Sequence, residues 1–472
     1  MSKELNFQRF CLYTLGTRQP ELALISRELS HWSNLDETVI GTVFVDLIDN
    51  DFGYAVLARD TAGRFRWVEG DSNIASQRQA EARLRTLLGT ITPDAQQGDE
   101  PAQPLDLLTP KTVEEGSELH PFFNLLISNP CKAPARRVLS EIGPWLLPAD
   151  NHLIGEFQRH QFDQRLWEFF LWAALREMNF IVEQLEAPDF LCSAPWEGIS
   201  FSVEATTAAP STEGPLAARV DTNTAEEIID FNRGYMAIKY GSALFAKLMK
   251  RNAQGEHYWE RERVRDIPFT LAIADFHMPG AIAEDDCAPP EIGSMVYSQT
   301  ALHEYLYGVR SMHEHVDGQL RVWTEEIEGH TFGSKRIPSG FFNLPNAEHV
   351  AAVIFSNAGT IAKFDRMGVG AGFKPADCRY FRQGLRYDPD PNAASGRAFM
   401  EEIEIGHDER WADEIQIFHN PRAIRPLPEE WFPSAQHHRF DGDNIVSIVP
   451  GTPVLASSTL CLHSRAPRPH DE

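Results

Sequence analysis

Between residues 157 and 277 the sequence alternates helical and strand-like patterns in an order that few folds accommodate. Residues 157–178 carry apolar residues at helical spacing, on a stripe that includes Leu166 and Phe169. Three short apolar segments suited to strands follow, and then a second helical segment. The last segment, IPFTLAIADFH, has the unbroken apolar run of a strand buried on both faces. This order predicts a mixed sheet flanked by helices.

Two of the expected strands carry an acidic residue. The segment PDFLCSAPWEGISFSVEATT at 188–207 predicts two strands joined by a turn, with Asp189 opening the first and Glu204 near the end of the second. If these strands are antiparallel neighbours, their carboxylates converge at one end of the sheet. Close carboxylates repel each other, and a bound Mg²⁺ or Mn²⁺ relieves that repulsion. Glu168 on the preceding helix is a candidate third acid, and Glu156, three turns upstream, is its rival.

The arrangement resembles the core of the PD-(D/E)xK nuclease-like superfamily, also called restriction-endonuclease-like. The resemblance is carried by RLWEFFL on the helix, PDF on one strand and VEAT on the next. It implies a mixed sheet flanked by helices and Mg²⁺-dependent hydrolysis of phosphodiester bonds. It also implies that Asp189 and Glu204 bind the metal and that Glu168 supports them.

One residue departs from the pattern of that superfamily. A lysine is expected two residues after the second acid, where its charge steers the attacking water and steadies the transition state, but this chain has Thr206. A threonine hydroxyl has no charge and cannot take that role directly. Lys239 and Lys247, on the following helix, are candidate substitutes. The alternative for the whole segment is ordinary turn chemistry at the Pro-Asp pair and a solvated glutamate.

The helix after the acidic pair begins a basic island. Eight Lys or Arg residues lie between positions 233 and 265, and Tyr and Trp residues among them suit stacking and phosphate contacts on nucleic acid. A solvated amphipathic helix is the other interpretation. The net charge of −25 opposes nucleic-acid binding over the whole surface but leaves room for a local patch. The candidate contacts are Arg233, Lys250, Arg251, Arg261 and Arg263.

Two other features have a simpler interpretation. AAVIFSNAGTIAKF, at 351–364, predicts a hairpin with a tight turn at 357–359, and we expect Lys363 and Arg366 to serve packing rather than phosphate binding. The six cysteines are scattered, without close spacing, which is typical of reduced thiols and of neither a disulfide scaffold nor a zinc site.

The domain organisation that we expect has four parts. They are an N-terminal α/β module at 1–91, a flexible linker at 92–118, a nuclease-like core at 119–300 and a mixed α/β extension at 301–472. No apolar stretch is long enough to span a membrane and no secretory signal is evident, so we expect a cytoplasmic protein, of bacterial type.

The function that we expect is a metal-dependent nuclease, acting on DNA by default and serving defence against foreign DNA. The alternative is a catalytically inactive scaffold of the same fold that binds nucleic acid or a partner protein. Thr206 and the acidic net charge favour that alternative. A protein partner or a second copy of the chain remains open.

Overall fold

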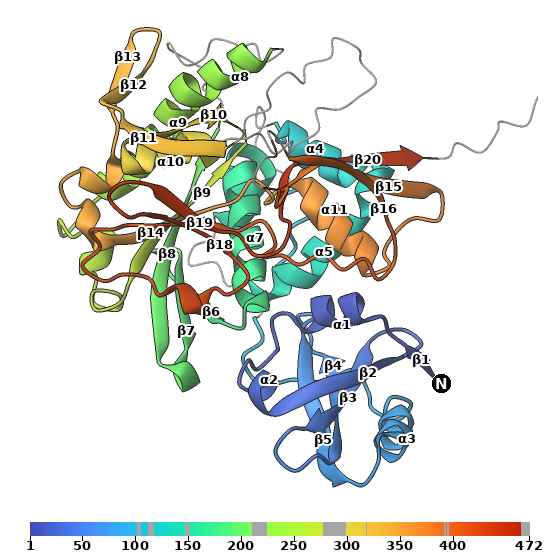
Figure 1. Cartoon of the computed structure of the whole chain (residues 1–472). Coiled ribbons are helices and arrows are strands. Elements are labelled where there is room, and N and C mark those ends of the chain that lie inside the picture. The colour runs from blue at the N-terminus through green and yellow to red at the C-terminus, as the bar shows by residue number, and fades with distance from the viewer. Residues whose placement is uncertain are drawn as a thin grey trace, which may run out of the picture.

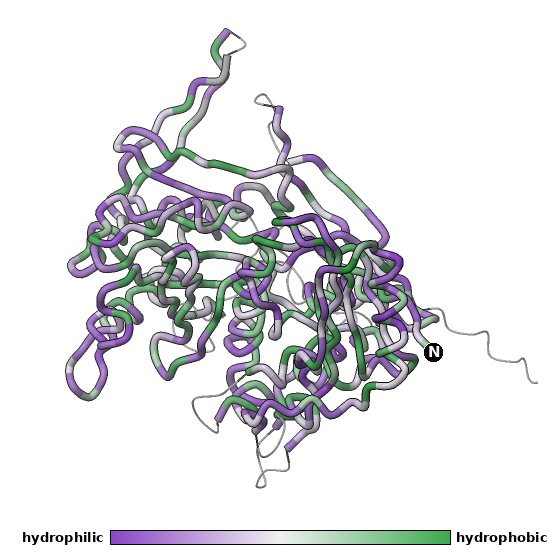
Figure 2. Tube along the Cα trace, turned by 90° about the horizontal axis from the view of Figure 1, so that it is seen from below, coloured by the Kyte–Doolittle hydropathy of each residue, from purple (hydrophilic) through white to green (hydrophobic). Residues whose placement is uncertain are grey.

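The computed structural model shows a mixed α/β protein with several sheets (Figure 1). It describes residues 1–101, 105–111, 118–146, 152–209, 224–276, 299–317, 319–390, 393 and 396–463. Among these residues no helix is both long enough and apolar enough to cross a membrane. In Figure 2 the outlying loops are mainly hydrophilic, whereas hydrophobic stretches run through the interior.

The N-terminal elements form a lobe of their own, blue in Figure 1. Its antiparallel sheet follows the sequence order. The strands are β1 (Ser2–Glu4), β2 (Ser26–Asn34), β3 (Val39–Asp46), β4 (Phe52–Arg59) and β5 (Phe65–Ile74). Successive residues of β3 enter different core clusters, one with α1 (Phe7–Thr14) and one with α3 (Gln77–Leu87), so these helices cover opposite faces of the sheet. Short α2 (Leu22–Ile25) precedes β2.

The predicted linker is partly held against the rest of the chain. In its described part, Leu107 is buried in the main core. The Gln158 side chain donates hydrogen bonds to the carbonyl oxygens of Leu107 and Thr109, at 3.1 and 2.9 Å. Residues 102–104 and 112–117 lie outside the described residues.

A helical layer leads from the linker to the site. It comprises α4 (Pro121–Ser128), α5 (Ala133–Ile142), α6 (Leu153–Gly155) and α7 (Phe162–Glu177), with 3-10 turns η1 (Pro130–Lys132) and η2 (Gly143–Trp145) and a π-helical turn η3 (Glu156–His160). The helix predicted from residue 157 therefore begins at Phe162, after the π-helical turn. Its expected apolar stripe is confirmed, since Leu166 and Phe169 are buried.

Within the described residues, eight strands form the largest sheet, in the order β19-β18-β17-β14-β9-β8-β7-β6. β8 pairs in parallel with β9, β9 with β14, and β17 with β18, while the other neighbours are antiparallel. The strands are β6 (Ile181–Gln184), β7 (Phe190–Ala194), β8 (Ile199–Ala208), β9 (Phe269–Asp275), β14 (Val350–Phe355), β17 (Gln416–His419), β18 (Gln436–Phe440) and β19 (Ile445–Ile448).

Both faces of this sheet are covered at β9. Ala272 and Ala274 belong to the core cluster that contains α7, whereas Leu271 and Ile273 belong to the cluster that contains α9 (Ala237–Met249) and α10 (Gln299–Tyr307). This is why the β9 sequence is continuously apolar. Ahead of α9 the chain forms α8 (Ala225–Asp230) and a π-helical segment η6 (Phe231–Met236), and η7 (Tyr258–Glu260) precedes β9.

The expected boundary at residue 300 falls inside the large sheet. β14, β17, β18 and β19 all come after it in sequence, yet they extend the sheet that β6 to β9 begin. The extension therefore completes the core sheet. Its remaining strands form three smaller groups: β10 (Val309–Val316) with β11 (Gln319–Glu326), β12 (Gly329–Phe332) with β13 (Lys335–Pro338), and β15 (Cys378–Arg386) between β16 (Arg397–Ile403) and β20 (Val454–His463). Short 3-10 turns η8 (Phe341–Asn343) and η9 (Ala347–His349) lead into β14.

The prediction of a hairpin at 351–364 is wrong. β14 is followed by helix α11 (Ile361–Gly370), not by a second strand. The polar face of α11 is buried by ion pairs, because Lys363 binds Glu409 at 2.8 Å and Glu414 at 3.0 Å, and Arg366 binds Glu409 at 2.9 Å. The expectation that these two cations serve packing agrees with this burial.

Candidate metal and active site

Strand register brings Asp189 and Glu204 together. β7 and β8 pair antiparallel with Phe190 opposite Val203, so one step further along the ladder Asp189 lies opposite Glu204. The backbone N–H of Ala205 donates to Oδ2 of Asp189 at 2.7 Å and fixes that carboxylate at the end of the strand. The convergence expected from the sequence is therefore present.

The two acids face a cavity of about 450 Å³. Side chains from α7, from the ends of β7 and β8 and from the C-terminal part of α9 line it. The lining residues that bear on chemistry are Asp163, Gln164, Glu168, Asp189, Glu204, Thr207, Lys247 and Lys250.

Glu204 has one paired and one unpaired carboxylate oxygen. Its side chain is 4% exposed, and Nζ of Lys247 donates to Oε1 at 2.5 Å. Oε2 is buried and has no hydrogen-bond partner among the described residues, and the same holds for the hydroxyl of Tyr258. The Tyr258 hydroxyl nevertheless lies beside this carboxylate, at the limit of hydrogen-bonding geometry: burial, the charge of Glu204 and this side-chain contact with Glu204 all raise the pKa of the tyrosine. An unpaired buried carboxylate oxygen fits a site for a cation.

Asp189 lies close to two other carboxylates, whose negative charges Lys247 does not fully offset. Burial raises its pKa well above the ordinary range, and the charges of Glu204 and Glu168 raise it further. Lys247 acts in the opposite direction without cancelling these effects. A divalent cation with a preference for oxygen ligands would remove the repulsion, so the residues present fit Mg²⁺ or Mn²⁺.

Glu168 supports the pair from a short distance. Among the described residues, the carboxylates of Glu168, Asp189 and Glu204 do not all come within 4.8 Å of one another. Gln164 and Arg165 donate to Glu168 at 2.9 and 2.6 Å, and burial raises its pKa.

Glu156, the rival for the role of Glu168, does not line the cavity. It pairs with Arg165 instead, where Nε donates at 2.9 Å. The structure therefore favours Glu168 as the helical acid near the site.

The structure distinguishes the candidates for the missing lysine. Lys247 contacts Glu204 directly, whereas neither Lys239 nor Thr206 lines the cavity. Lys239 lies two helical turns before Lys247, where burial, followed by the charge of Lys335, lowers its pKa. Thr207 is the threonine that lines the cavity, and its hydroxyl is within 3.3 Å of Oε1 of Gln164.

The expected basic contacts are only partly gathered at the site. Lys250 lines the cavity, and Arg261 donates to the carbonyl oxygen of Ala187 at 2.8 Å, two residues before Asp189. The others are engaged elsewhere: Arg233 pairs with Glu304, Arg251 donates to the carbonyl oxygen of Gly255, and Arg263 pairs with Glu183.

The aromatic residues of the basic island are buried, so the expectation that they stack on bases is wrong. Tyr235, Tyr240, Tyr258 and Trp259 all belong to the core beneath α9. Apolar packing takes precedence over exposure because each ring buries a large area.

Comparison with protein-family models, curated proteins and solved structures finds no match. The chemistry of the cavity therefore rests on this chain's own residues. The sequence analysis missed three residues of the cavity lining: Asp163, Gln164 and Thr207. Asp163 and Gln164 stand one turn before Glu168 and so share its end of α7, which is a signal that helical spacing could have given.

Proposed function

We propose that this protein is a Mg²⁺-dependent nuclease that hydrolyses phosphodiester bonds, with DNA as the first substrate to test. The observation that supports this most is the buried pair Asp189 and Glu204, in which one carboxylate oxygen has no partner and a lysine contacts the other.

The surrounding elements agree with a restriction-endonuclease-like core. α7 precedes the antiparallel strands β6, β7 and β8, and α9 follows them and leads to β9, which is parallel to β8. This is a mixed sheet flanked by helices, as the sequence resemblance implies. Asp189 directly precedes β7, and Glu204 lies in the second half of β8, opposite it.

Each side chain has a distinct role in this proposal. Asp189 and Glu204 would hold the metal, and Glu168 would support them through its negative charge. Bound there, the metal would supply a positioned water and charge neutralisation at the phosphate. Lys247 orients Glu204 and brings the positive charge that Thr206 lacks.

Substrate would approach through the cavity mouth. Lys250 lines it, and Nε of Arg261 is buried without a hydrogen bond among the described residues. Both cations lie near the acids, which suits contacts to the phosphates that flank the scissile bond. With a net charge of −25, binding would depend on this patch alone and would weaken as salt rises.

Cleavage assays on the whole chain test the proposal. We expect Mg²⁺ or Mn²⁺ to activate cutting of plasmid or oligonucleotide substrates, and Asp189→Asn and Glu204→Gln each to reduce the rate by about 10²–10³-fold. Glu197→Gln is the matched control, because Glu197 is an exposed acid in the turn between the same two strands. We expect it to cut at the wild-type rate.

Two outcomes would overturn the proposal. One is cutting by both acid variants at the rate of Glu197→Gln. The other is no cutting of DNA or RNA with either metal and no rise in melting temperature on adding metal, since an ion that binds the folded state must stabilise it. If such an inactive protein still bound oligonucleotides, the scaffold alternative would replace the nuclease.

A further inference from the structure

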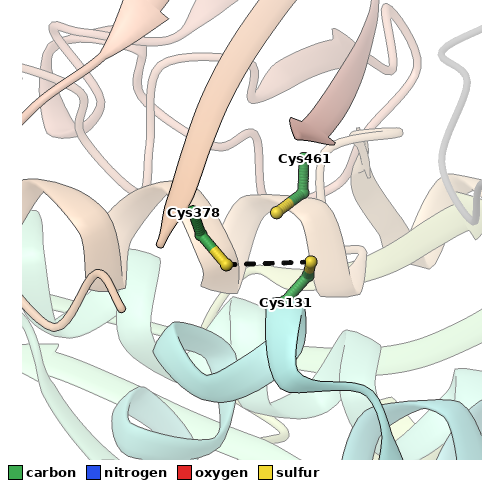
Figure 3. Close-up of side chains that lie close together, drawn as sticks. All are labelled: Cys131, Cys378 and Cys461. Carbon is green, nitrogen blue, oxygen red and sulfur yellow. Dashed lines mark hydrogen bonds between the residues drawn. The ribbon is translucent and has the colours of Figure 1, made fainter. Parts of the chain in front are cut away.

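Three cysteines meet at one point, although their wide spacing in the sequence led us to expect scattered thiols and no zinc site. Cys131 lies in η1, Cys378 begins β15 and Cys461 lies near the end of β20. Their sulfur atoms lie within 4.8 Å of one another, and those of Cys131 and Cys378 are 3.9 Å apart. Figure 3 shows the three side chains pointing toward one another from three separate elements.

The register of β15 and β20 brings a histidine to the same place. Cys378 pairs with His463, and Tyr380 pairs with Cys461. Directly opposed residues, and residues two apart on one strand, share a face of the sheet. His463 therefore lies on the face that carries Cys378 and Cys461.

The imidazole of His463 is already oriented by a carboxylate. Its Nε2 lies 2.7 Å from Oδ2 of Asp377, and the ligand atoms of Asp377, Cys378 and His463 lie within 4.8 Å of one another. A carboxylate that accepts the N–H of a histidine fixes the tautomer and leaves the lone pair on the other ring nitrogen, here Nδ1. This is the usual companion of a histidine that binds a metal.

We propose that Cys131, Cys378 and Cys461 hold a structural zinc ion, with His463 as the fourth ligand. The His463 ring lies within 4.8 Å of the Cys378 sulfur but not of the other two sulfurs, so it must turn toward them when zinc binds. Three thiolates and one imidazole are a donor set that zinc prefers in structural sites. Zn–S bonds of about 2.3 Å in a tetrahedron place sulfurs about 3.8 Å apart, close to the distance between Cys131 and Cys378. A disulfide between the same two residues would need the sulfurs to approach to about 2.05 Å.

The neighbouring contacts suit a site that joins parts of the fold. The Tyr380 hydroxyl donates to the carbonyl oxygen of Cys131 at 2.7 Å, which positions η1 over the strands. Lys132 is paired with buried Asp365 of α11 at 2.8 Å, so its ammonium group is held next to the thiols. A zinc ion here would tie the helical layer before the acidic site to the C-terminal sheet.

Metal analysis of the purified chain tests this proposal, independently of any nuclease activity. We expect about one zinc per chain, in accord with a single four-ligand site. The variants Cys461→Ser and His463→Gln should lose most of the bound zinc. Cys11→Ser is the matched control, because Cys11 is a half-buried thiol on α1, in the N-terminal lobe. It should keep the full complement.

Cobalt gives a second readout that does not depend on how the zinc was acquired. We expect the metal-free chain, titrated with Co²⁺ under reducing conditions, to show thiolate-to-cobalt charge-transfer absorption. Wild type and Cys11→Ser should show it equally, and Cys461→Ser should show a weaker band. Zinc removal should lower the melting temperature, because metal binding is coupled to folding.

Several results would overturn the site. They are no zinc and no charge-transfer band in the wild-type chain, a Cys461→Ser variant that binds as much metal as Cys11→Ser, or a Cys131–Cys378 disulfide that persists when zinc is supplied. The wild-type cobalt titration decides the matter even if a variant fails to fold.

Discussion

At the scale of single residues, the carboxylate of Glu204 is divided between two environments. Lys247 satisfies Oε1, and Oε2 is buried beside the Tyr258 hydroxyl without a well-formed hydrogen bond among the described residues. Leaving a charged oxygen buried and unpaired is costly, so such groups are kept where a ligand completes them. This asymmetry makes the site suited to binding a cation.

Replacing Lys247 should show whether its contact with Glu204 is needed for activity, rather than a positive charge anywhere on α9. We expect Lys247→Met to reduce metal-dependent cleavage by about 10²–10³-fold, because it removes the positive charge beside Glu204. Lys239→Met is the matched control on the same helix, and it should retain activity because Lys239 does not line the cavity. Rates measured at saturating metal test this, and equal loss in both variants would contradict the assignment of Lys247.

The sequence predicts the two acids of the site and narrows the lysine to two candidates, but it does not decide between Lys239 and Lys247. Asp189 and Glu204 follow from local pattern, because a strand, a turn and a strand bring them together over a few residues. Lys247 is 43 residues from Glu204 in the chain, and only the packing of α9 on β8 selects it over Lys239. Thr206 was a candidate because of its position in a linear motif, and that position does not reach the cavity.

At the scale of elements, α7 carries buried charge at both ends. Near its C-terminal end the carboxylate of Glu177 accepts a hydrogen bond from the backbone N–H of Ala412 at 3.1 Å. Burial raises the pKa of Glu177 from 4.5 to about 7. The fold therefore favours the protonated form of this residue more than the unfolded chain does.

This shift predicts how stability depends on pH. The contribution of Glu177 is complete below about pH 4.5 and is lost as the pH rises through about 7. We expect Glu177→Gln, which stays neutral, to be more stable than wild type above pH 7 by about 1–2 kcal/mol. The difference should be smaller at pH 5 and should vanish below about pH 4.5.

Urea unfolding at pH 5 and pH 8 checks this expectation. Glu197→Gln, exposed in the turn before β8, should match wild type at both values. If the free energy of unfolding of Glu177→Gln changes with pH as it does in wild type, a group other than Glu177 controls that pH dependence.

The residues of α11 explain why the sequence predicted a second strand at this place instead of a helix. Its residues Lys363, Asp365 and Arg366 are all buried, so neither helical alternation of apolar and polar residues nor strand alternation is visible in the sequence. Their partners come from distant segments, such as Glu409 and Glu414. Ion pairing across the fold replaces the apolar stripe that normally identifies a helix.

At the scale of the whole molecule, Arg176 of α7 is one of several residues that join the N-terminal lobe to the rest of the described chain. The Arg176 guanidinium donates to the carbonyl oxygens of Leu15, Gly16 and Arg18 in the lobe and of Phe180 beyond the helix, at 2.7 to 3.1 Å. The indole of Trp145 also packs so closely on Gly16 that a Cβ there would lie 2.2 Å from it. The module expected at 1–91 thus has specific contacts with the rest of the chain.

Removing that arginine should loosen the whole assembly. We expect Arg176→Met to lower the free energy of unfolding by about 2–4 kcal/mol, because it leaves several partly buried carbonyls without a donor. Arg83→Met is the control: its ion pair with Asp71 is exposed and should contribute less than about 1 kcal/mol. Denaturant unfolding measures both free energies. Equal losses would mean that the hydrogen bonds of Arg176 stabilise the fold no more than an exposed ion pair does.

The continuous large sheet has a consequence for the growing polypeptide on the ribosome. The strands that carry the acids, and β9 beside them, are synthesised well before β14, which covers the far edge of β9. Until β14 emerges, β9 offers an open edge of unpaired backbone groups, and nascent chains are vulnerable to wrong pairing at such edges. Because chain synthesis proceeds from the N-terminus, the large sheet is therefore completed late, after the strands that carry the acids have already emerged.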